Sequence, residues 1–224
     1  MAKVTLLLNF MAVLILSTAC HELTHAWLAD RFGDDTPRRA GRMSLNPFVH
    51  IHPVFTVLAP AVMFWMGGGF FSAAWTPVTP SKMRRPHVHG LLVALGGPAS
   101  NLVLAAAAFL VLAVLILLSG GFGEGTSPRM LGVLNLFYMA VHLNLFLALF
   151  NFLPVPPLDG SAVVGFLLPE GLREGWAGLR RHSLILFVVL SATGVLGKVL
   201  HPATDAAREV VDFGIRIVNG LAHG

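Results

Sequence analysis

The sequence predicts an all-α polytopic membrane protein, and its charge content, its apolar content and the lengths of its apolar runs carry this prediction. Only 12% of the 224 residues are charged, 55% are hydrophobic, and the mean hydropathy is +0.76. A soluble domain carries about 25% charged residues, so this chain cannot cover a water-facing surface. Several apolar runs approach the roughly 20 residues that a spanning helix needs, which predicts a bundle of about four to six transmembrane helices.

Five apolar stretches are the candidates for these helices. They cover residues 4–28, 54–75, 91–118, 131–153 and 183–200. The first begins like a signal peptide but continues directly into ionisable residues, so we expect it to be a retained transmembrane helix. The second is interrupted by Pro60 and by three successive glycines at 67–69.

The C-terminal segment carries a different pattern. Residues 205–221 space valine, isoleucine and leucine against charged residues, which predicts an amphipathic helix on the membrane surface or packed on the bundle. We expect one membrane-embedded domain over residues 1–224, with its core at 4–168 and its C-terminal helices at 183–222.

Two classes of site are disfavoured by the composition. The sequence pI is about 10, but the basic residues lie in short loops between apolar runs and are not interleaved with aromatic residues, so we expect no nucleic-acid partner. The expected surroundings are the lipid bilayer. The single cysteine, Cys20, excludes both an intramolecular disulfide framework and a cysteine-rich zinc site.

The first stretch ends in an HExxH motif formed by His21, Glu22 and His25. On a helix, residues four apart share one face, so both imidazoles can bind one metal ion. Glu22 occupies the position from which the carboxylate of this motif acts as general base. The alternative is two helix-face histidines beside a charge. Ionisable residues at the end of an apolar helix mark function, which favours the metal site.

A catalytic zinc ion usually has three protein ligands, and the best third candidate is Asp159. It follows the fourth apolar stretch and a proline-rich bend, and Gly160 after it permits close approach of the backbone. A carboxylate at membrane depth needs a partner, which two neutral histidines and a divalent cation supply. The alternative is that Asp159 caps a short helix over residues 160–168.

Three motifs together resemble the site-2 protease family, most closely its short forms without PDZ or CBS domains. They are HELTHAWLADRFGDDTPRRAGRMSLNPFVHIHP at residues 21–53, GGPASN at 96–101 and NFLPVPPLDG at 151–160, in the family's order. The resemblance therefore covers residues 21–160 and is more specific than HExxH alone.

The resemblance implies a role for five residues. His21, His25 and Asp159 would bind one zinc ion per chain, and Glu22 would activate the zinc-bound water. Asn151 matches a family asparagine that steadies the substrate backbone or the oxyanion. These roles describe an intramembrane zinc endopeptidase that hydrolyses peptide bonds within or next to transmembrane segments of membrane proteins.

The resemblance also implies a small membrane-embedded strand region between the first and second full spans. Residues 38–47 resemble the family segment that pairs with an unwound substrate. The chain departs from the family pattern at His52, where an aspartate is common, and in the histidines His87 and His89. We expect neither His50 nor His52 to bind the metal, and we favour structural roles or hydrogen bonds to the metal ligands for both.

The ligand positions constrain the topology. If the first helix ends near His25 and the fourth ends just before Asp159, both run the same way, so an odd number of crossings separates them. Residues 91–118 supply one crossing, so residues 54–75 should form a re-entrant hairpin, whose irregular backbone the protein must cover.

This topology also places most basic residues on one side of the membrane. They are Arg31, Arg38, Arg39, Arg42, Lys82, Arg84, Arg85, Arg173, Arg180 and Arg181, against Lys3 and Arg129 on the other. That side should be cytoplasmic, which places the site of a multi-pass cell-membrane protein near the cytoplasmic face.

Two other functions fit parts of the pattern. A catalytically silent scaffold or binding module of this fold has no reason to retain Glu22. A metal transporter needs a polar path, yet the other spans carry few ionisable residues besides His142. We expect a bundle hydrogen bond or a water path at His142, a position facing the site for Asn144, and close helix packing at residues 96–100.

Overall fold

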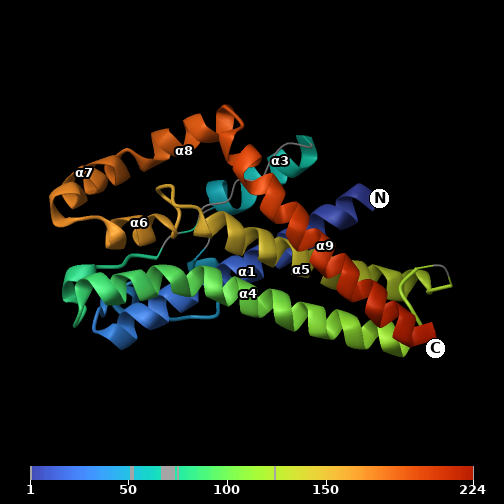
Figure 1. Ribbon diagram of the computed structural model, residues 1–224. Coiled ribbons are helices and arrows are strands. Elements are labelled where there is room, and N and C mark those ends of the chain that lie inside the picture. Colours follow the sequence, from blue (N-terminus) through green and yellow to red (C-terminus); the bar gives the residue numbers. More distant parts are fainter. Residues whose placement is uncertain (1, 51–52, 67–73, 75, 124, 224) are drawn as a thin grey trace.

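The computed structural model describes residues 2–50, 53–66, 74, 76–123 and 125–223 (Figure 1). Its helices are α1 (Ala2–Phe32), α2 (Thr36–Arg39), η1 (Pro47–Val49), η2 (Pro53–Leu58), α3 (Ala59–Met66), η3 (Pro80–Lys82), α4 (Pro86–Ser119), α5 (Pro128–Phe152), α6 (Ser161–Leu167), α7 (Glu170–Arg181), α8 (Ser183–Ala192) and α9 (Val195–His223). The described residues contain no β-strand, and the predicted all-α class is confirmed for them.

Three of these helices, α1, α4 and α5, are long and apolar enough to cross a membrane. Their outward faces are apolar: on α4, Val103, Leu110 and Leu118 are 68%, 66% and 77% exposed. Apolar surface of this extent is stable against lipid and unstable against water. The described residues therefore provide three candidate spans, fewer than the four to six that the sequence predicted.

The three spans pack against one another, with α4 opposite in direction to α1 and α5 (Figure 1). At one end, the ring of Phe32, the last residue of α1, stacks at 4.2 Å on His89 in the first turn of α4. Buried Leu14 of α1 packs with Leu143 and Leu147 of α5. Helices α1 and α5 therefore run in the same direction, and the one candidate span between them in the chain runs in the opposite direction. The ligand positions required this arrangement.

The described part of the second apolar stretch changes from π-helix to α-helix next to Pro60, and the three glycines at 67–69 lie outside the described residues. The described part forms the π-helix η2 and then α3, which reaches the start of α1: Lys3 Nζ donates a hydrogen bond to the carbonyl of Trp65 at 3.1 Å. Residues 76–79 lie beside α1 and α2: the Thr79 hydroxyl is 3.1 Å from that of Thr36, the first residue of α2, and Thr76 Oγ1 contacts Glu22 of α1. Residues 67–73 and 75 lie outside the described part of the chain, so the re-entrant hairpin stays a prediction.

The strand region expected from the family resemblance is not confirmed. Residues 38–47 form the end of α2, a series of turns and the first residue of η1. The Asn46 side chain caps η1 by accepting a hydrogen bond from Phe48 N at 3.1 Å. This cap satisfies a backbone group of the segment locally, as expected for asparagine before proline.

The fifth apolar stretch, residues 183–200, was wrongly predicted as one helix. The chain divides it into α8 and the start of α9 at Gly194. The φ of Gly194 is 71°, a left-handed conformation that glycine adopts without the steric strain other residues would have. The predicted amphipathic helix exists but begins earlier, at Val195. Val211 and Ile215 on one face of α9 pack against α4 and α5, so α9 belongs to the bundle.

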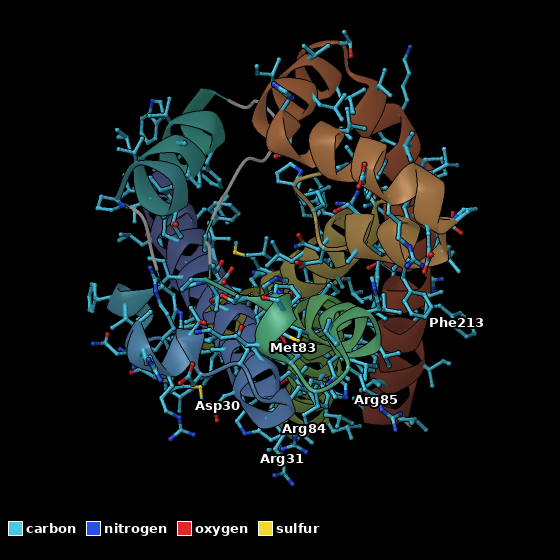
Figure 2. The ribbon with its side chains drawn as sticks, turned by 90° about the vertical axis from the view of Figure 1, so that its left-hand side faces the viewer. Asp30, Arg31, Met83, Arg84, Arg85 and Phe213 are labelled. Atoms are coloured by element: carbon cyan, nitrogen blue, oxygen red, sulfur yellow. The ribbon has the colours of Figure 1, made fainter. Side chains whose placement is uncertain are left out.

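The end of the bundle where α1 finishes and α4 begins is basic. Figure 2 looks onto this end and shows Arg31, Arg84 and Arg85 near one another. Arg84 Nη2 donates a hydrogen bond to the carbonyl of Arg31 at 3.4 Å, and Arg84 N donates to the carbonyl of Phe32 at 3.0 Å. The two helix ends are therefore joined directly, and their basic side chains gather at one surface.

Candidate metal centre

The two motif histidines lie together inside the bundle because α1 is a regular helix through residues 21–25. Their Nε2 atoms are 3.0 Å apart, and the His21 and His25 side chains are almost fully enclosed, with 8% and 7% of their residue surfaces exposed. Two buried imidazole nitrogens at this distance either share a hydrogen or bind a common cation, and the tautomers decide which.

The tautomer of His25 follows from its second nitrogen. His25 Nδ1 lies 2.8 Å from the carbonyl oxygen of Val93 on α4. A backbone carbonyl only accepts hydrogen bonds, so Nδ1 must carry the hydrogen of the neutral ring. The lone pair of the neutral imidazole is then on Nε2, directed toward His21, which is the arrangement found for metal-binding histidines.

The third group, Asp159, is brought to the histidines by a tight turn after α5. Gly160 N donates a hydrogen bond to the carbonyl of Asn151 at 2.6 Å, which closes the turn. A Cβ atom at Gly160 would lie 2.3 Å from the carbonyl oxygen of Phe152, so only glycine fits. Asp159 Oδ2 consequently lies 3.1 Å from His21 Nε2 and 3.4 Å from His25 Nε2.

The predicted alternative role of Asp159 as a helix cap is wrong. The following helix, α6, begins at Ser161, and its N-cap position is occupied by Gly160. Asp159 Oδ2 is buried and receives no hydrogen bond. Oδ2 lies within 3.4 Å of both histidine rings, so the carboxylate is directed into the cluster.

This cluster fits a tetrahedral zinc ion. The three candidate ligand atoms form a triangle with sides of 3.0, 3.1 and 3.4 Å. Zinc bonded to nitrogen and oxygen at about 2.0–2.1 Å in a tetrahedron separates its ligands by about 3.3 Å. His21, His25 and Asp159 form the one such group found in the part of the chain that the structure describes, and the histidine–carboxylate donor set suits catalytic zinc.

Glycine on α4 makes room beside the cluster. A Cβ atom at Gly97 would lie 2.3 Å from His25 Nε2 and 2.6 Å from His21 Nε2. The sequence predicted close helix packing at this residue, and the structure adds that the backbone of α4 lines the metal centre itself. At Gly96, by contrast, a Cβ atom would meet Leu28, which is a packing contact.

Glu22 lies next to His21 on α1 and is 5% exposed. Its carboxylate accepts a hydrogen bond from Thr76 Oγ1 at 2.6 Å, and the same hydroxyl lies 3.3 Å from the Glu22 carbonyl. Sequence reasoning missed Thr76 because no motif includes it and 54 residues separate it from Glu22. The contact ties the proposed general base to the segment that follows α3.

Asn151 occupies the last turn of α5, beside the turn that holds Asp159. Its side-chain Nδ2 donates a hydrogen bond to the carbonyl of Leu147 at 2.9 Å, within its own helix. An amide nitrogen carries two hydrogens, so one N–H group is left for a ligand. The oxyanion role that the family resemblance implies therefore stays a prediction.

Other histidines that the structure describes make contacts outside the cluster. His50 is buried, with Nε2 2.8 Å from the Ser44 carbonyl, and His52 lies outside the described residues. His89 stacks on Phe32, and His142 Nδ1 donates to the Tyr138 carbonyl at 2.8 Å. The bundle hydrogen bond predicted for His142 is thus a bond within its own helix.

Comparison with known proteins gives a consistent result. The model of the family described as peptidase family M50 matches residues 9–193. The protein named "Putative zinc metalloprotease YwhC" from Bacillus subtilis is 37% identical over 198 residues, covering 88% of this chain and 86% of that protein.

More distant relatives carry similar names. "Putative zinc metalloprotease Rip2" from Mycolicibacterium smegmatis is 31% identical over 187 residues, which are 82% of this chain and 66% of that protein. "Putative zinc metalloprotease MJ0611" from Methanocaldococcus jannaschii is 30% identical over 146 residues, 64% of this chain and 62% of that protein. No solved structure matches the chain significantly.

Gly97→Ala tests the steric limit beside the cluster. The added methyl group would overlap both Nε2 atoms, so we expect zinc affinity, measured by chelator competition on the purified protein, to fall more than about tenfold. Gly90→Ala is the matched control, because it lies on the same helix and its Cβ atom would meet only Pro80, at 3.8 Å. Equal zinc affinity in both variants would contradict the geometry described above.

Proposed function

Because this chain belongs to peptidase family M50, the family of the site-2 proteases, we propose that it is an intramembrane zinc endopeptidase. Its substrates would be transmembrane proteins or peptides, cleaved within or next to their membrane segments. The single observation that carries the proposal is the convergence of His21 Nε2, His25 Nε2 and Asp159 Oδ2 beside the buried Glu22.

One zinc ion per chain would be held by His21, His25 and Asp159. When bound, zinc acts as a Lewis acid that polarises a carbonyl and lowers the pKa of a coordinated water to about 7. The protein contributes enclosure: His21 and His25 are buried, and Gly97 of α4 lies directly beside them, which strengthens electrostatic interactions at the cluster.

In this mechanism, Glu22 is the general base. Its carboxylate accepts the proton of the attacking water and returns it to the leaving amine. The hydrogen bond from Thr76 fixes one carboxylate oxygen, which leaves the other oxygen as the proton acceptor. Asn151, with one side-chain N–H free, would donate to the oxyanion or to the substrate backbone.

The substrate must be locally unwound before it can react. A helical segment hides its carbonyls in the i to i+4 hydrogen-bond ladder, and an enclosed site cannot accept an intact helix. We expect cleavage near a helix end or at helix-weakening residues. The apolar outer surfaces of α1 and α4 suit a substrate that arrives through the bilayer.

The enzyme is favoured over a catalytically silent scaffold because Glu22 is held at an energetic cost. A buried carboxylate without a compensating role is unfavourable, and here it is enclosed and hydrogen-bonded beside the metal cluster. We infer further that the basic end of the bundle, with Arg31, Arg84 and Arg85, faces the cytoplasm, which places the site near that face.

Cysteine labelling tests this orientation. In a Cys20→Ala background, Ser81→Cys and Ser127→Cys introduce single thiols at exposed positions just before α4 and just before α5. Because α4 separates them, we expect a membrane-impermeant maleimide to label residue 127 on intact cells and residue 81 only after permeabilisation. The reverse pattern would invert the topology, and labelling of both on intact cells would exclude α4 as a span.

Glu22→Gln tests the chemistry. Co-expressed with single-span candidate substrates, this variant should lose cleavage by about 10²–10⁴-fold, since it removes the proton acceptor. Its zinc content, measured on the same purified protein, should remain at the wild-type level because no metal ligand is changed. Equal cleavage by wild type and variant would rule out Glu22 as the base.

Thr76→Val tests how the base is positioned. The valine keeps the shape of the side chain and removes the hydroxyl that donates to Glu22, so we expect the cleavage rate constant kcat to fall about tenfold. Thr76→Ser retains a hydroxyl and should recover most of the rate. If Val and Ser variants cleave at the same rate, the hydrogen bond has no part in catalysis.

A further inference from the structure

We propose that Asn101 and Asn144 form a hydrogen-bond relay that fixes the tautomer and orientation of His21. The inference rests on the proposed function, because it takes His21 as a ligand of the metal. Asn101 and Asn144 would act through His21 and touch neither metal nor substrate, so they are positioning residues.

The relay starts at the backbone carbonyl of Ala140, which can only accept a hydrogen bond. Asn144 Nδ2 lies 2.9 Å from the carbonyl oxygen of Ala140, one turn earlier on α5. A carbonyl only accepts, so the NH₂ side of the Asn144 amide must face it. The Asn144 oxygen is thereby turned away from Ala140, toward α4.

The next amide is oriented by the first. Asn101 Nδ2 on α4 lies 3.0 Å from Asn144 Oδ1 and donates to it. This places the Asn101 oxygen on the opposite side, 2.6 Å from His21 Nδ1. An oxygen facing Nδ1 requires the ring hydrogen there, so the lone pair of neutral His21 lies on Nε2, toward Asp159 and His25.

The order of donors and acceptors admits only one arrangement. If Asn101 were turned over, its NH₂ group would face the hydrogen of His21 Nδ1, and its oxygen would face the oxygen of Asn144. Both contacts would be repulsive, at a site where Asn101 is fully buried and Asn144 is 3% exposed. Buried polar groups without partners are costly, so the alternative is strongly disfavoured.

A purely structural role for Asn101 and Asn144 would require only the hydrogen bond between them. Paired asparagines often join helices inside membranes, and the bond between Asn101 and Asn144 does join α4 to α5. That role leaves the Asn101 oxygen unassigned, whereas the structure places it at short hydrogen-bond distance from a candidate metal ligand. The contact with His21 distinguishes positioning from packing.

The two histidines are consequently held by different means. His25 donates to the backbone carbonyl of Val93, which no side-chain substitution removes. His21 depends on two side chains, so substitutions at Asn101 should disturb one ligand and leave the other in place. The expected result is a metal centre that is weakened and altered while the helices remain folded.

The test measures metal binding without any substrate. We would compare wild type, Asn101→Leu and Asn101→Asp for zinc affinity by chelator competition, and for the visible absorption spectrum of bound Co²⁺. Leucine removes the acceptor, so zinc affinity should fall about 10–100-fold and the Co²⁺ bands should shift. Aspartate keeps an acceptor for His21 Nδ1 but no longer donates to Asn144 Oδ1, so its zinc affinity should lie between those of wild type and Asn101→Leu.

Asn144→Leu examines the remote end of the relay and covers the case that Asn101→Leu does not fold. It should lower zinc affinity less than Asn101→Leu, and the double variant should bind no more weakly than Asn101→Leu alone, because both act through one path. Asn135→Leu, an exposed asparagine on the same helix, is the control. Its affinity should equal that of wild type, and its effect should add to that of Asn101→Leu.

Unchanged zinc affinity in both leucine variants would overturn the relay. An equal loss in Asn101→Leu and Asn101→Asp, with helix content intact by circular dichroism, would overturn it too, because the acceptor would then be irrelevant. These outcomes leave the proposed function standing if wild type binds zinc and cleaves. Wild type that binds no divalent ion would remove both proposals together.

Discussion

The structure depends on the convergence of three metal-binding atoms, His21 Nε2, His25 Nε2 and Asp159 Oδ2, whose lone pairs point to one enclosed site. His25 cannot turn its lone pair elsewhere, because the Val93 carbonyl holds the ring hydrogen on the other side. Asp159 adds a carboxylate oxygen that no hydrogen-bond donor reaches. Such a cluster repels itself unless a cation is present. Each element that brings the groups together, from the parallel course of α1 and α5 to the tight turn at Gly160, is then stabilised by that cation when it binds.

Helix α4 presents an apolar face to the lipid and a face with small and polar residues to the bundle. Toward the lipid it presents large apolar residues such as Leu110 and Leu118. Toward the bundle it buries Gly97 and Asn101, one turn apart, a residue with no side chain and one with a polar side chain. The glycine admits the metal cluster, and the asparagine reaches past it to His21. Polar groups inside a membrane protein are costly unless they are paired, and here the oxygen and the nitrogen of the Asn101 amide each have a hydrogen-bond partner.

Local signals made parts of this arrangement predictable. The apolar runs identified α1, α4 and α5, and the spacing of His21 and His25 placed both on one helix face, because helix periodicity acts within a few residues. Asp159 needed the additional signal of a proline-rich bend before a glycine. Contacts across the chain carried no such signal: 80 residues separate His21 from Asn101, and only the packing of α1 on α4 brings them together. The break at Gly194 was missed because the residues around it are apolar on both sides, and hydropathy does not register a left-handed backbone.

The three candidate metal ligands come from different parts of the chain, so they are synthesised at different times. Two come from adjacent turns of α1, which is made before α4 and α5, and the third follows α5, the last of the three candidate spans among the described residues. A nascent chain that has inserted only α1 and α4 has just the imidazole pair, which binds a divalent ion far more loosely than the complete set. The proposed hydrolytic centre would therefore be assembled only after all three spans are made, which would protect the partly translated chain and its neighbours in the bilayer from premature proteolysis.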